Sequence, residues 1–436
     1  MQTATTHAEL GSDFFDVVEA ARFPEHILRY RNHRAAAEVG LDTLTDEAWV
    51  NHLGRFLPLP GSFPAPLALR YHGHQFQHYN PDLGDGRGFL FAQLYDDRGR
   101  LMDLGTKGSG QTPWSRGGDG RLTLKGGVRE VLATSMLEAL GVDTSRTLSL
   151  IETGEALARG DEPSPTRSAV MVRLNHSHIR IGTFQRLATR RETDNIRRLL
   201  SHCVRYYVTE SDGTAPSFLD AVVARVARLA AQYMAAGFVH GVLNTDNINI
   251  TGESFDYGPW RFLPTYDAAF TAAYFDHGGL YAYGRQPETM LWNLSRLAEC
   301  LLPLSDREAL VGVLDTFSAR FRAALDDATR WRLGVTGGDM AAWYAWLNAS
   351  QTPFAEAFHA CHRGIVPPGA AWDGARAALS GTVPHRPHHA YFDGAPCTML
   401  IEDVEALWDP IATADDWAPL RAKLEAIETM REAYAG

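Results

Sequence analysis

Cysteine is scarce in this 436-residue chain, and the cysteines it has are widely separated. The four are Cys203, Cys300, Cys361 and Cys397, and no C-x-x-C pair occurs. Structural zinc sites and disulfide frameworks usually need closely spaced cysteines, so this spacing indicates neither. Sparse, scattered cysteine is typical of proteins kept in a reducing compartment, and we therefore expect a cytoplasmic protein.

The chain also lacks an excess of basic residues. Lys and Arg total 41 against 52 Asp and Glu, which gives a formal net charge of −11. Because nucleic-acid binding generally depends on a basic surface, we expect no nucleic-acid partner. A local basic pocket for phosphate groups remains compatible with this balance.

Long apolar runs are missing too. No uninterrupted apolar stretch has membrane-spanning length, so we expect no association with a membrane. Residues 1–13 carry two acids and no apolar core, which is unlike a secretory signal. The composition is otherwise that of an ordinary globular protein, with 45% hydrophobic and 21% charged residues. The length predicts about two or three domains.

Strand-like patterns precede helical ones along the chain. Strand patterns cover residues 89–95, 101–107, 147–151 and 169–174, and helical periodicity covers 44–55, 124–140, 190 onward, 217–236, 288–303, 306–327 and 417–433. The proline-rich run at 58–66 opposes regular structure and predicts an extended strap. This order indicates an α+β protein with a strand-rich first half and a helical second half.

The polar segment 240–247 (HGVLNTDN) and the following Asp256-Tyr257-Gly258 carry the most informative chemistry. A short strand at 248–250 is expected to connect them. Mg²⁺ and Mn²⁺ prefer oxygen ligands and usually take one or two carboxylates plus phosphate oxygens. Kinase-like folds place a catalytic Asp, a metal-binding Asn five residues later and an Asp-Phe-Gly in this order. The metal ligands here would be Asn247 and Asp256.

The position that holds the base of an ordinary kinase is apolar in this chain. Five residues before Asn247 stands Val242, and the only carboxylate within the loop is Asp246. Either the loop is built around Asp246, or the protein binds a nucleotide without phosphorylating anything. A third interpretation is a polar turn, because Asn, Asp and Gly dominate turns for local reasons.

Two further features could hold phosphates. In the segment Gly84-Asp85-Gly86-Arg87-Gly88, glycines allow close backbone approach and the Arg offers a bidentate fork, although Gly-Asp-Gly is also a common hairpin turn. Lys107 ends a predicted strand and Glu130 lies on the next predicted helix, a pairing that kinase-like folds use to hold phosphates. The alternative is a surface Lys and a solvated Glu.

Two loops complete the candidate site. Residues 108–121 are rich in glycine and hydroxyl groups, with two Arg, as expected of a segment that covers a ligand. Arg173 and Arg180 flank a short polar segment and form either a polyphosphate clamp or two solvent salt bridges. The three histidines within residues 71–78 are interpreted as structural, since nothing indicates a convergent metal geometry.

Taken together, these segments resemble selenoprotein O and its bacterial relatives, which are pseudokinases that act as protein AMPylases. The matching segments are 73–76, 84–87, 107–113, 118–121, 129–130, 144–146, 177–180, 240–247, 256–259 and 292–294. The resemblance implies ATP bound in a flipped orientation, with AMP transferred to Ser, Thr or Tyr hydroxyls of proteins. It also accounts for Val242, because the family lacks the usual kinase base.

The resemblance implies roles for individual positions. Lys107 would pair with Glu130 and contact phosphate. Arg173 and Arg180 would hold the buried end of the triphosphate. The other nucleotide-contacting positions would be Gly84, Gly86, Arg87, Asp119, Gly120 and Asp256.

The same resemblance implies that Asn247 and Asp256 bind Mg²⁺ or Mn²⁺ and that Asp246 is the proton acceptor. The match fades beyond about residue 300, and no cysteine follows Cys397, so redox control through a C-terminal cysteine is not expected.

The expected fold is a two-lobed protein-kinase-like structure. Its strand-rich N-lobe would span 70–185, and its helical C-lobe with a C-terminal extension would span 186–436, while residues 1–70 wrap outside. The expected partners are ATP and protein substrates that the sequence does not identify, and we expect a monomer. The alternatives to AMP transfer are an inactive nucleotide-binding scaffold and an ordinary kinase that transfers the γ-phosphate.

Overall fold

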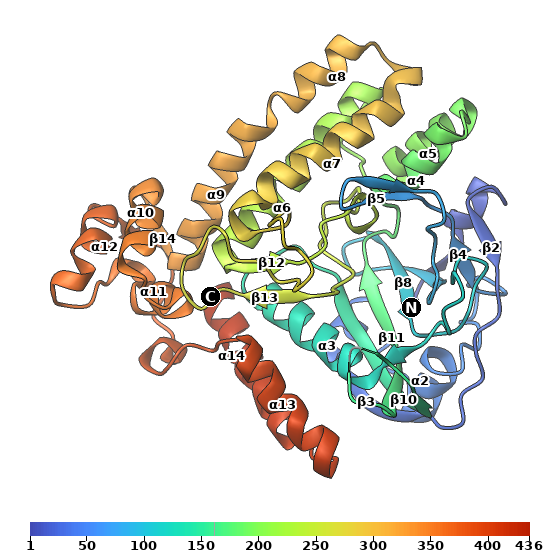
Figure 1. Ribbon diagram of the computed structural model, residues 1–436, viewed down its shortest axis with the longest axis horizontal. Helices are drawn as coiled ribbons and strands as arrows, with labels where there is room; N and C mark the ends of the chain where they lie inside the picture. Colours follow the sequence, from blue (N-terminus) through green and yellow to red (C-terminus); the bar gives the residue numbers. More distant parts are fainter. Residues whose placement is uncertain (161) are drawn as a thin grey trace.

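The computed structural model describes residues 1–160 and 162–436. It is a mixed α/β structure in which one large antiparallel sheet lies on one side of the molecule and most helices of the second half lie on the other (Figure 1). No helix among the described residues combines the length and apolarity needed to cross a lipid bilayer.

The large sheet has nine strands in the order β2-β4-β7-β8-β11-β10-β3, with β1 paired to β7 and β9 paired to β11. Its strands are β1 (Thr3–Ala4), β2 (Phe15–Val17), β3 (Ile27–Arg31), β4 (Leu67–Leu69), β7 (Leu90–Tyr95), β8 (Leu101–Lys107), β9 (Leu122–Thr123), β10 (Arg146–Leu157) and β11 (Thr166–Asn175). Three two-stranded sheets are formed by β5 (Gly73–Gln75) with β6 (His78–Asn80), β12 (Phe238–His240) with β13 (Trp260–Phe262), and β14 (Val335–Thr336) with β15 (Val383–Pro384).

The helices are α1 (His33–Glu38), α2 (Asp46–Leu53), α3 (Leu124–Ala139), α4 (Ile181–Thr189), α5 (Thr193–Tyr206), α6 (Ala215–Ala236), α7 (Gln286–Leu301), α8 (Arg307–Leu314), α9 (Phe317–Leu333), α10 (Met340–Ser350), α11 (Phe354–Ala360), α12 (Asp373–Ala378), α13 (Ile401–Ala414) and α14 (Ala418–Ala435). Most lie in the second half of the chain, as the periodicity predicts. Residues before 70 supply four strands of the large sheet, and the division of the chain into lobes stays a prediction.

Alternation along the central strands gives the large sheet two different faces. Met102 and Leu104 of β8 pack with α1 and α2 in one apolar cluster, whereas Leu101 belongs to the cluster that contains α3. Successive strand residues point to opposite faces, so Asp103, Gly105 and Lys107 lie on the α3 face together with Leu101. This face carries the polar residues of the candidate site.

Helix α6 and its cap set the position of the polar segment 240–247. Thr214 caps the N-terminus by accepting a hydrogen bond from the Ser217 amide, and Gly237 ends the helix in the left-handed region at φ 69°. The chain then enters β12 directly. The apolar side chains of α6 lie in the same core cluster as those of α3 and α7, so one continuous core joins the sheet to the helices.

Two expectations of local structure are wrong. Residues 248–250 make only an isolated bridge to Arg180, because the partner segment turns into α4 at Ile181 and the Asn249 side chain accepts from the Thr251 amide at 3.1 Å in a local turn. The helix expected over 306–327 is divided into α8 and α9. At the division the Thr316 amide bonds the Val313 carbonyl, a tighter i to i−3 turn than an α-helix makes.

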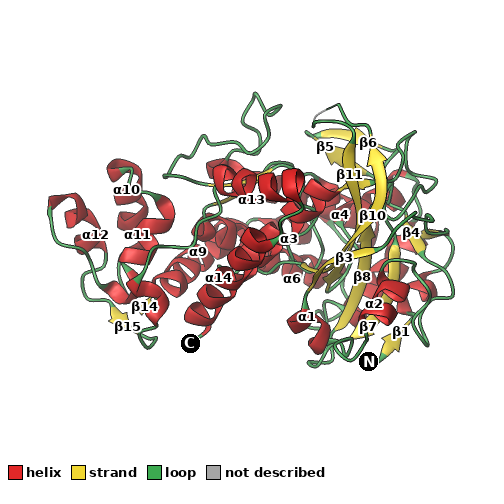
Figure 2. Ribbon diagram, turned by 90° about the horizontal axis from the view of Figure 1, so that it is seen from below, coloured by secondary structure: helices red, strands yellow, loops and turns green. Residues whose placement is uncertain are grey.

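The C-terminal helices α13 and α14 return to the sheet side of the molecule and lie against α3 (Figure 2). Lys125 at the start of α3 pairs with Glu405 of α13 at 2.7 Å. Asp415, between the two helices, pairs with Arg29 of β3 at 3.1 Å and with Arg167 of β11 at 2.7 Å. The end of the chain is therefore tied to both the sheet and the helix that carries Glu130.

Candidate active site

A cleft of about 690 Å³ collects nearly all of the predicted site residues. Those that line it are Gly84, Gly86, Arg87, Lys107, Asp119, Gly120, Arg173, Arg180, Asp246, Asn247 and Asp256. Glu130 does not line the cleft but contacts Lys107 from behind. The structure thus brings together residues from the large sheet, two glycine-rich loops and the loops after α6, and their binding roles remain predictions.

Lys107 is the cation at the centre of the cleft. Its ammonium group forms a buried ion pair with Glu130 of α3 and lies 3.1 Å from Asp256 Oδ1. The pair is buried because α3 packs across β10 and β11 on the face of the sheet that carries Lys107, which excludes the solvated arrangement that we considered from sequence. An ammonium held in this way presents a fixed positive charge to a ligand in the cleft.

Asp256 is a carboxylate that stays ionised. It adopts a left-handed backbone at φ 63°, and Arg173 Nη1 donates to its Oδ1 at 3.2 Å. Burial pushes its pKa up, but the positive charges of Lys107, Arg173 and other cleft cations outweigh burial and hold the pKa well below its usual range. The side chain still exposes 28% of its surface, so it can reach a ligand in the cleft.

Asp246 sits in a short 3₁₀ turn, Thr245–Asn247, and is nearly buried. Its Oδ1 accepts no hydrogen bond from the described part of the chain. Gly73 approaches it so closely that a Cβ at that position would lie 2.8 Å from Oδ1. Burial, only partly offset by the charge of Arg180, raises the pKa of this carboxyl to about 7. A carboxyl with these properties is suited to accept a proton near neutral pH.

Asn247 and Asp256 have the donor atoms that a hard cation requires. The Asn247 amide is oriented because its Nδ2 donates to the Val242 carbonyl at 2.8 Å, which leaves Oδ1 to act as a ligand. Among the described residues no group of three or more His, Cys, Asp or Glu side chains could hold a metal ion. One carboxylate and one amide oxygen therefore fit a cation that also takes phosphate oxygens, as Mg²⁺ and Mn²⁺ do.

Arg180 precedes α4 and is 1% exposed. Its guanidinium carbon lies 4.0 Å from the Tyr71 ring centroid and 5.0 Å from that of Phe255. Its Nε and Nη2 find no hydrogen-bond partner within the residues described. Leaving buried donors unsatisfied costs about 1–3 kcal/mol per group, so an anionic ligand in the cleft gives these two N–H groups a function.

The β5–β6 hairpin is a part of the site whose role sequence reasoning missed. The His74 amide donates to Thr245 Oγ1 at 2.7 Å, and the Phe76 amide donates to Asn244 Oδ1 at 3.1 Å. The hairpin therefore fixes the loop that carries Asp246. The clustered histidines were a visible signal, and two of their rings bond within the protein, His72 Nδ1 with the Tyr79 hydroxyl at 2.5 Å and His74 Nδ1 with Gln185 Nε2 at 2.7 Å. The loop that the hairpin contacts lies far away in sequence.

Other residues line the cleft without having been predicted individually. They are Tyr71, Gln75, Trp114, Ser115, Arg116 and Arg159, among others. Three of them belong to the loop 108–121, whose glycines, hydroxyls and arginines did predict a ligand cover. Tyr71 and Arg159 carried no comparable signal, because a single aromatic or basic residue outside a motif is ordinary.

Comparison with known proteins identifies relatives along most of the chain. Residues 1–362 match the family model described as protein adenylyltransferase SelO. A protein nucleotidyltransferase YdiU from Synechocystis sp. is 44% identical over 463 residues, covering 96% of each chain. The protein of the same name from Synechococcus elongatus is 45% identical over 96% of this chain and 93% of its own. The Trichodesmium erythraeum protein of that name is 53% identical over 71% of this chain and 67% of its own.

Proposed function

The chain belongs to the protein adenylyltransferase SelO family, and from that membership and the cleft we propose that it transfers AMP from ATP to hydroxyl side chains of proteins. The observation that carries the proposal is the position of Asp246. Its carboxyl is buried beside Arg180, its Oδ1 has no hydrogen-bond partner among the described residues, and the kinase base position in the same loop is occupied by Val242. The loop therefore has a proton acceptor, but in a different place from that of a kinase.

In this mechanism Asp246 accepts the proton of the acceptor hydroxyl as its oxygen attacks the α-phosphorus of ATP. The new bond joins that oxygen to the α-phosphorus, and the bond between the α-phosphorus and the bridging oxygen breaks. The electron pair leaves with pyrophosphate. Arg173, Arg180 and Lys107 hold the β- and γ-phosphates, where negative charge grows, and such preorganised charges are a major source of catalysis.

Asn247 and Asp256 would hold Mg²⁺ or Mn²⁺, which would neutralise phosphate charge when bound. Gly84, Gly86, Arg87, Asp119 and Gly120 line the same cleft and would contact the rest of the nucleotide. The flipped orientation of ATP follows from placing its triphosphate end against Arg173 and Arg180. This end is the more buried one, since Arg180 is almost inaccessible.

The proposed architecture is a two-lobed kinase-like fold, with an N-lobe at 70–185, a C-lobe at 186–436, and an N-terminal extension at 1–70 whose four strands join the large sheet. The pairing of strand Lys107 with helix Glu130 and the shared cleft of Asp246 and Asp256 support this proposal. The partners would be ATP and protein substrates. Four free cysteines, three of them buried, favour a cytoplasmic location, and a monomer stays our expectation.

ATP labelled at either the α- or the γ-phosphate tests the function. The purified chain is incubated with a protein extract and Mg²⁺ or Mn²⁺, and labelled protein is measured. We expect incorporation from the α label only, with release of pyrophosphate. Incorporation from the γ label would indicate an ordinary kinase, and ATP binding with no incorporation from either label would indicate an inactive scaffold.

A further inference from the structure

We propose that Asp103 and His178 are positioning residues that aim the Arg173 guanidinium into the cleft, and that Gly105 provides the space in which they do so. This inference rests on the proposed function, because it concerns a residue assigned there to the β- and γ-phosphates of ATP. Asp103 and His178 themselves lie behind the cleft and do not line it.

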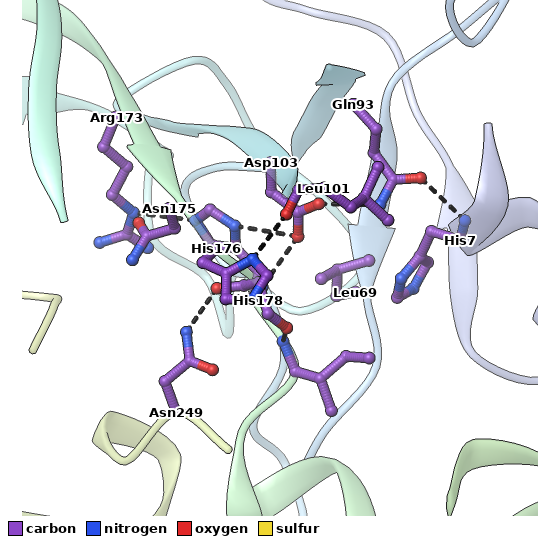
Figure 3. A network of polar contacts seen from close by, with 12 residues as sticks. His7, Leu69, Gln93, Leu101, Asp103, Arg173, Asn175, His176, His178 and Asn249 are labelled. Carbon is purple, nitrogen blue, oxygen red and sulfur yellow. Dashed lines mark hydrogen bonds and ion pairs between the residues drawn. The ribbon is translucent and has the colours of Figure 1, made fainter. Parts of the chain in front are cut away.

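The three side chains form one continuous line of hydrogen bonds (Figure 3). Asp103 Oδ2 accepts from the His178 backbone amide at 2.8 Å and lies 3.4 Å from His178 Nδ1. Arg173 Nε donates to His178 Nε2 at 3.2 Å. The other end of the guanidinium, Nη1, donates to Asp256 Oδ1 at 3.2 Å. The line therefore runs from a buried acid in β8 to the proposed metal ligand.

The direction of these bonds fixes the state of the imidazole. An Arg side chain only donates, so His178 Nε2 must accept and cannot carry a proton. The ring proton then lies on Nδ1, facing Asp103, and the imidazole is neutral. Burial lowers the pKa of His178 more than Asp103 raises it, which agrees with this neutral form. Asp103 thereby selects the tautomer that makes His178 an acceptor for Arg173.

Gly105 gives the His178 ring its place on the sheet. A Cβ at position 105 would lie 2.1 Å from His178 Nε2, so the ring occupies the space that any side chain would fill. Gly105 pairs with Arg173 across the β8–β11 ladder. The ring therefore rests directly beside the backbone of the residue that it orients.

Asp103 is itself held by side chains from two other elements. Its Oδ1 accepts from Gln93 Nε2 of β7 at 2.8 Å and from the Tyr207 hydroxyl after α5 at 3.4 Å. Gln93 in turn accepts from the His7 backbone amide at 2.9 Å (Figure 3). Asp103 is fully buried, and both of its carboxylate oxygens accept hydrogen bonds from fixed donors. Its position is therefore restricted, and so is the position of the His178 ring that it contacts.

The arrangement has a consequence for Asp256. Within the described residues, Arg173 makes side-chain hydrogen bonds only to His178 and Asp256, and each uses a different part of its fork. Without the bond to Nε, the guanidinium could turn and pair with both carboxylate oxygens of Asp256, as Arg commonly does. In that pairing neither the Arg173 guanidinium nor the Asp256 carboxylate would be available to a bound ligand. The bond from Arg173 Nε to His178 leaves only Nη1 bonded to Asp256, and the remaining N–H groups of Arg173 point into the cleft.

Two substitutions at His178 separate the acceptor role from the size of the ring. In His178→Asn, the amide can still face Asp103 but no atom replaces Nε2. In His178→Gln, the longer side chain can place its oxygen where Nε2 was. We expect His178→Asn to raise KM for ATP or lower kcat, with kcat/KM falling about 10- to 100-fold, while the affinity for AMP changes less than about twofold. His178→Gln should recover most of the loss.

The matched control is His176→Gln, the same substitution two residues away on a ring that contacts the Leu101 carbonyl and not Arg173. It should keep wild-type kinetics. Gly105→Ala displaces the His178 ring without changing a polar group, and it should reproduce the selective loss of ATP affinity. If His178→Asn does not fold, Gly105→Ala alone tests whether His178 positions Arg173. Thermal melting of each variant verifies the fold.

Equal weakening of ATP and AMP binding in His178→Asn, or wild-type kinetics in both His178→Asn and Gly105→Ala, would overturn the positioning role. Failure of the wild-type chain to transfer AMP would instead overturn the proposed function. The two failures are distinguishable, because the ratio of ATP to AMP affinity, measured by calorimetry, reports the positioning of Arg173 even without turnover.

Discussion

Asp246 and Asp256 line the same cleft, but their carboxyl groups meet opposite electrostatic environments. Burial raises the pKa of Asp246 to about 7, and its Oδ1 has no hydrogen-bond partner among the residues described. Asp256, by contrast, lies against Lys107 and Arg173, which together hold its pKa well below the usual range despite burial. Two acids whose environments separate them in this way can take different roles, one moving a proton and the other binding a cation.

The charge of Asp256 is the first target for a test. We expect Asp256→Ala to abolish AMP transfer and to weaken metal-dependent ATP binding by about 10- to 100-fold, since the triphosphate then loses the cation that neutralises it. Calorimetry with and without Mg²⁺ measures this. Affinity for ATP in the absence of metal serves as the control, and an unchanged gain in affinity on adding Mg²⁺ would contradict the assignment.

Asp246 should behave differently from Asp256. Asp246→Asn keeps the shape of the side chain but removes the proton acceptor, so we expect AMP transfer to fall by about 10²- to 10⁴-fold. Metal-dependent ATP affinity should stay within about threefold of wild type, because the phosphate-binding cations and the proposed metal ligands are unchanged. Transfer at the wild-type rate would show that another group takes the proton.

A third prediction concerns the ion cluster that ties the C-terminal helices to the sheet. Glu152 of β10 accepts from Arg29 and Arg167 at 2.7 Å, and its side chain is 8% exposed. Glu152→Gln leaves two arginines without their buried carboxylate, and we expect a loss of roughly 3 kcal/mol in the free energy of unfolding at pH 7. Asp415→Asn, on the exposed side of the same cluster, should cost less than about 1 kcal/mol.

The loss at Glu152 should also depend on pH. Burial raises the pKa of Glu152, but the hydrogen bonds and charges of Arg167 and Arg29 outweigh burial and hold it below its ordinary value of 4.5. A lowered folded-state pKa contributes stability that is present above 4.5 and is lost as the pH falls through the folded pKa. Chemical denaturation from pH 7 down to 3 should therefore show the wild type and Glu152→Gln converging. A constant difference would exclude this charge as the cause.

The sequence predicted the parts of this structure that depend on local pattern or on a motif. Strand 101–107 and helix 124–140 have clear periodicity, and the residues Lys107 and Glu130 could be paired because kinase-like folds link them in that order. The helical periodicity was less informative for α10, an 11-residue helix in which alanines and Tyr344 stand between the buried Met340, Trp343, Trp346 and Leu347. Short helices of this kind carry little amphipathic contrast.

What the sequence did not predict depends on contacts between distant segments. Nothing local to Asp103 or His178 indicates that they meet, and Gly105 is an ordinary glycine until the ring packed against it is known. The expected strand at 248–250 was wrong because its partner segment enters α4 at Ile181 and the Asn249 side chain closes a local turn with the Thr251 amide. These contacts and the conformation of residues 248–250 depend on tertiary geometry, which the periodicity of a single sequence does not reveal.

The last prediction concerns which end of ATP is buried, because the reaction follows from it. AMP transfer requires the α-phosphorus to face the acceptor while fixed cations hold the departing pyrophosphate. Arg180 is the most deeply buried of these cations, and two of its nitrogen atoms lack partners in the described structure. Arg180→Ala should reduce AMP transfer by about 10²- to 10³-fold and weaken ATP binding, yet leave the affinity for AMP nearly unchanged, since AMP has no β- or γ-phosphate.

The comparison with AMP makes this test specific to orientation. Arg87→Ala, at the glycine-rich loop of the same cleft, removes an equal charge from a different part of the site. If Arg180 lies at the pyrophosphate end, its loss should lower the ratio of ATP to AMP affinity more than the loss of Arg87 does. If AMP binding falls as much as ATP binding in Arg180→Ala, while circular dichroism shows an intact fold, Arg180 does not contact the pyrophosphate and the flipped orientation loses its support.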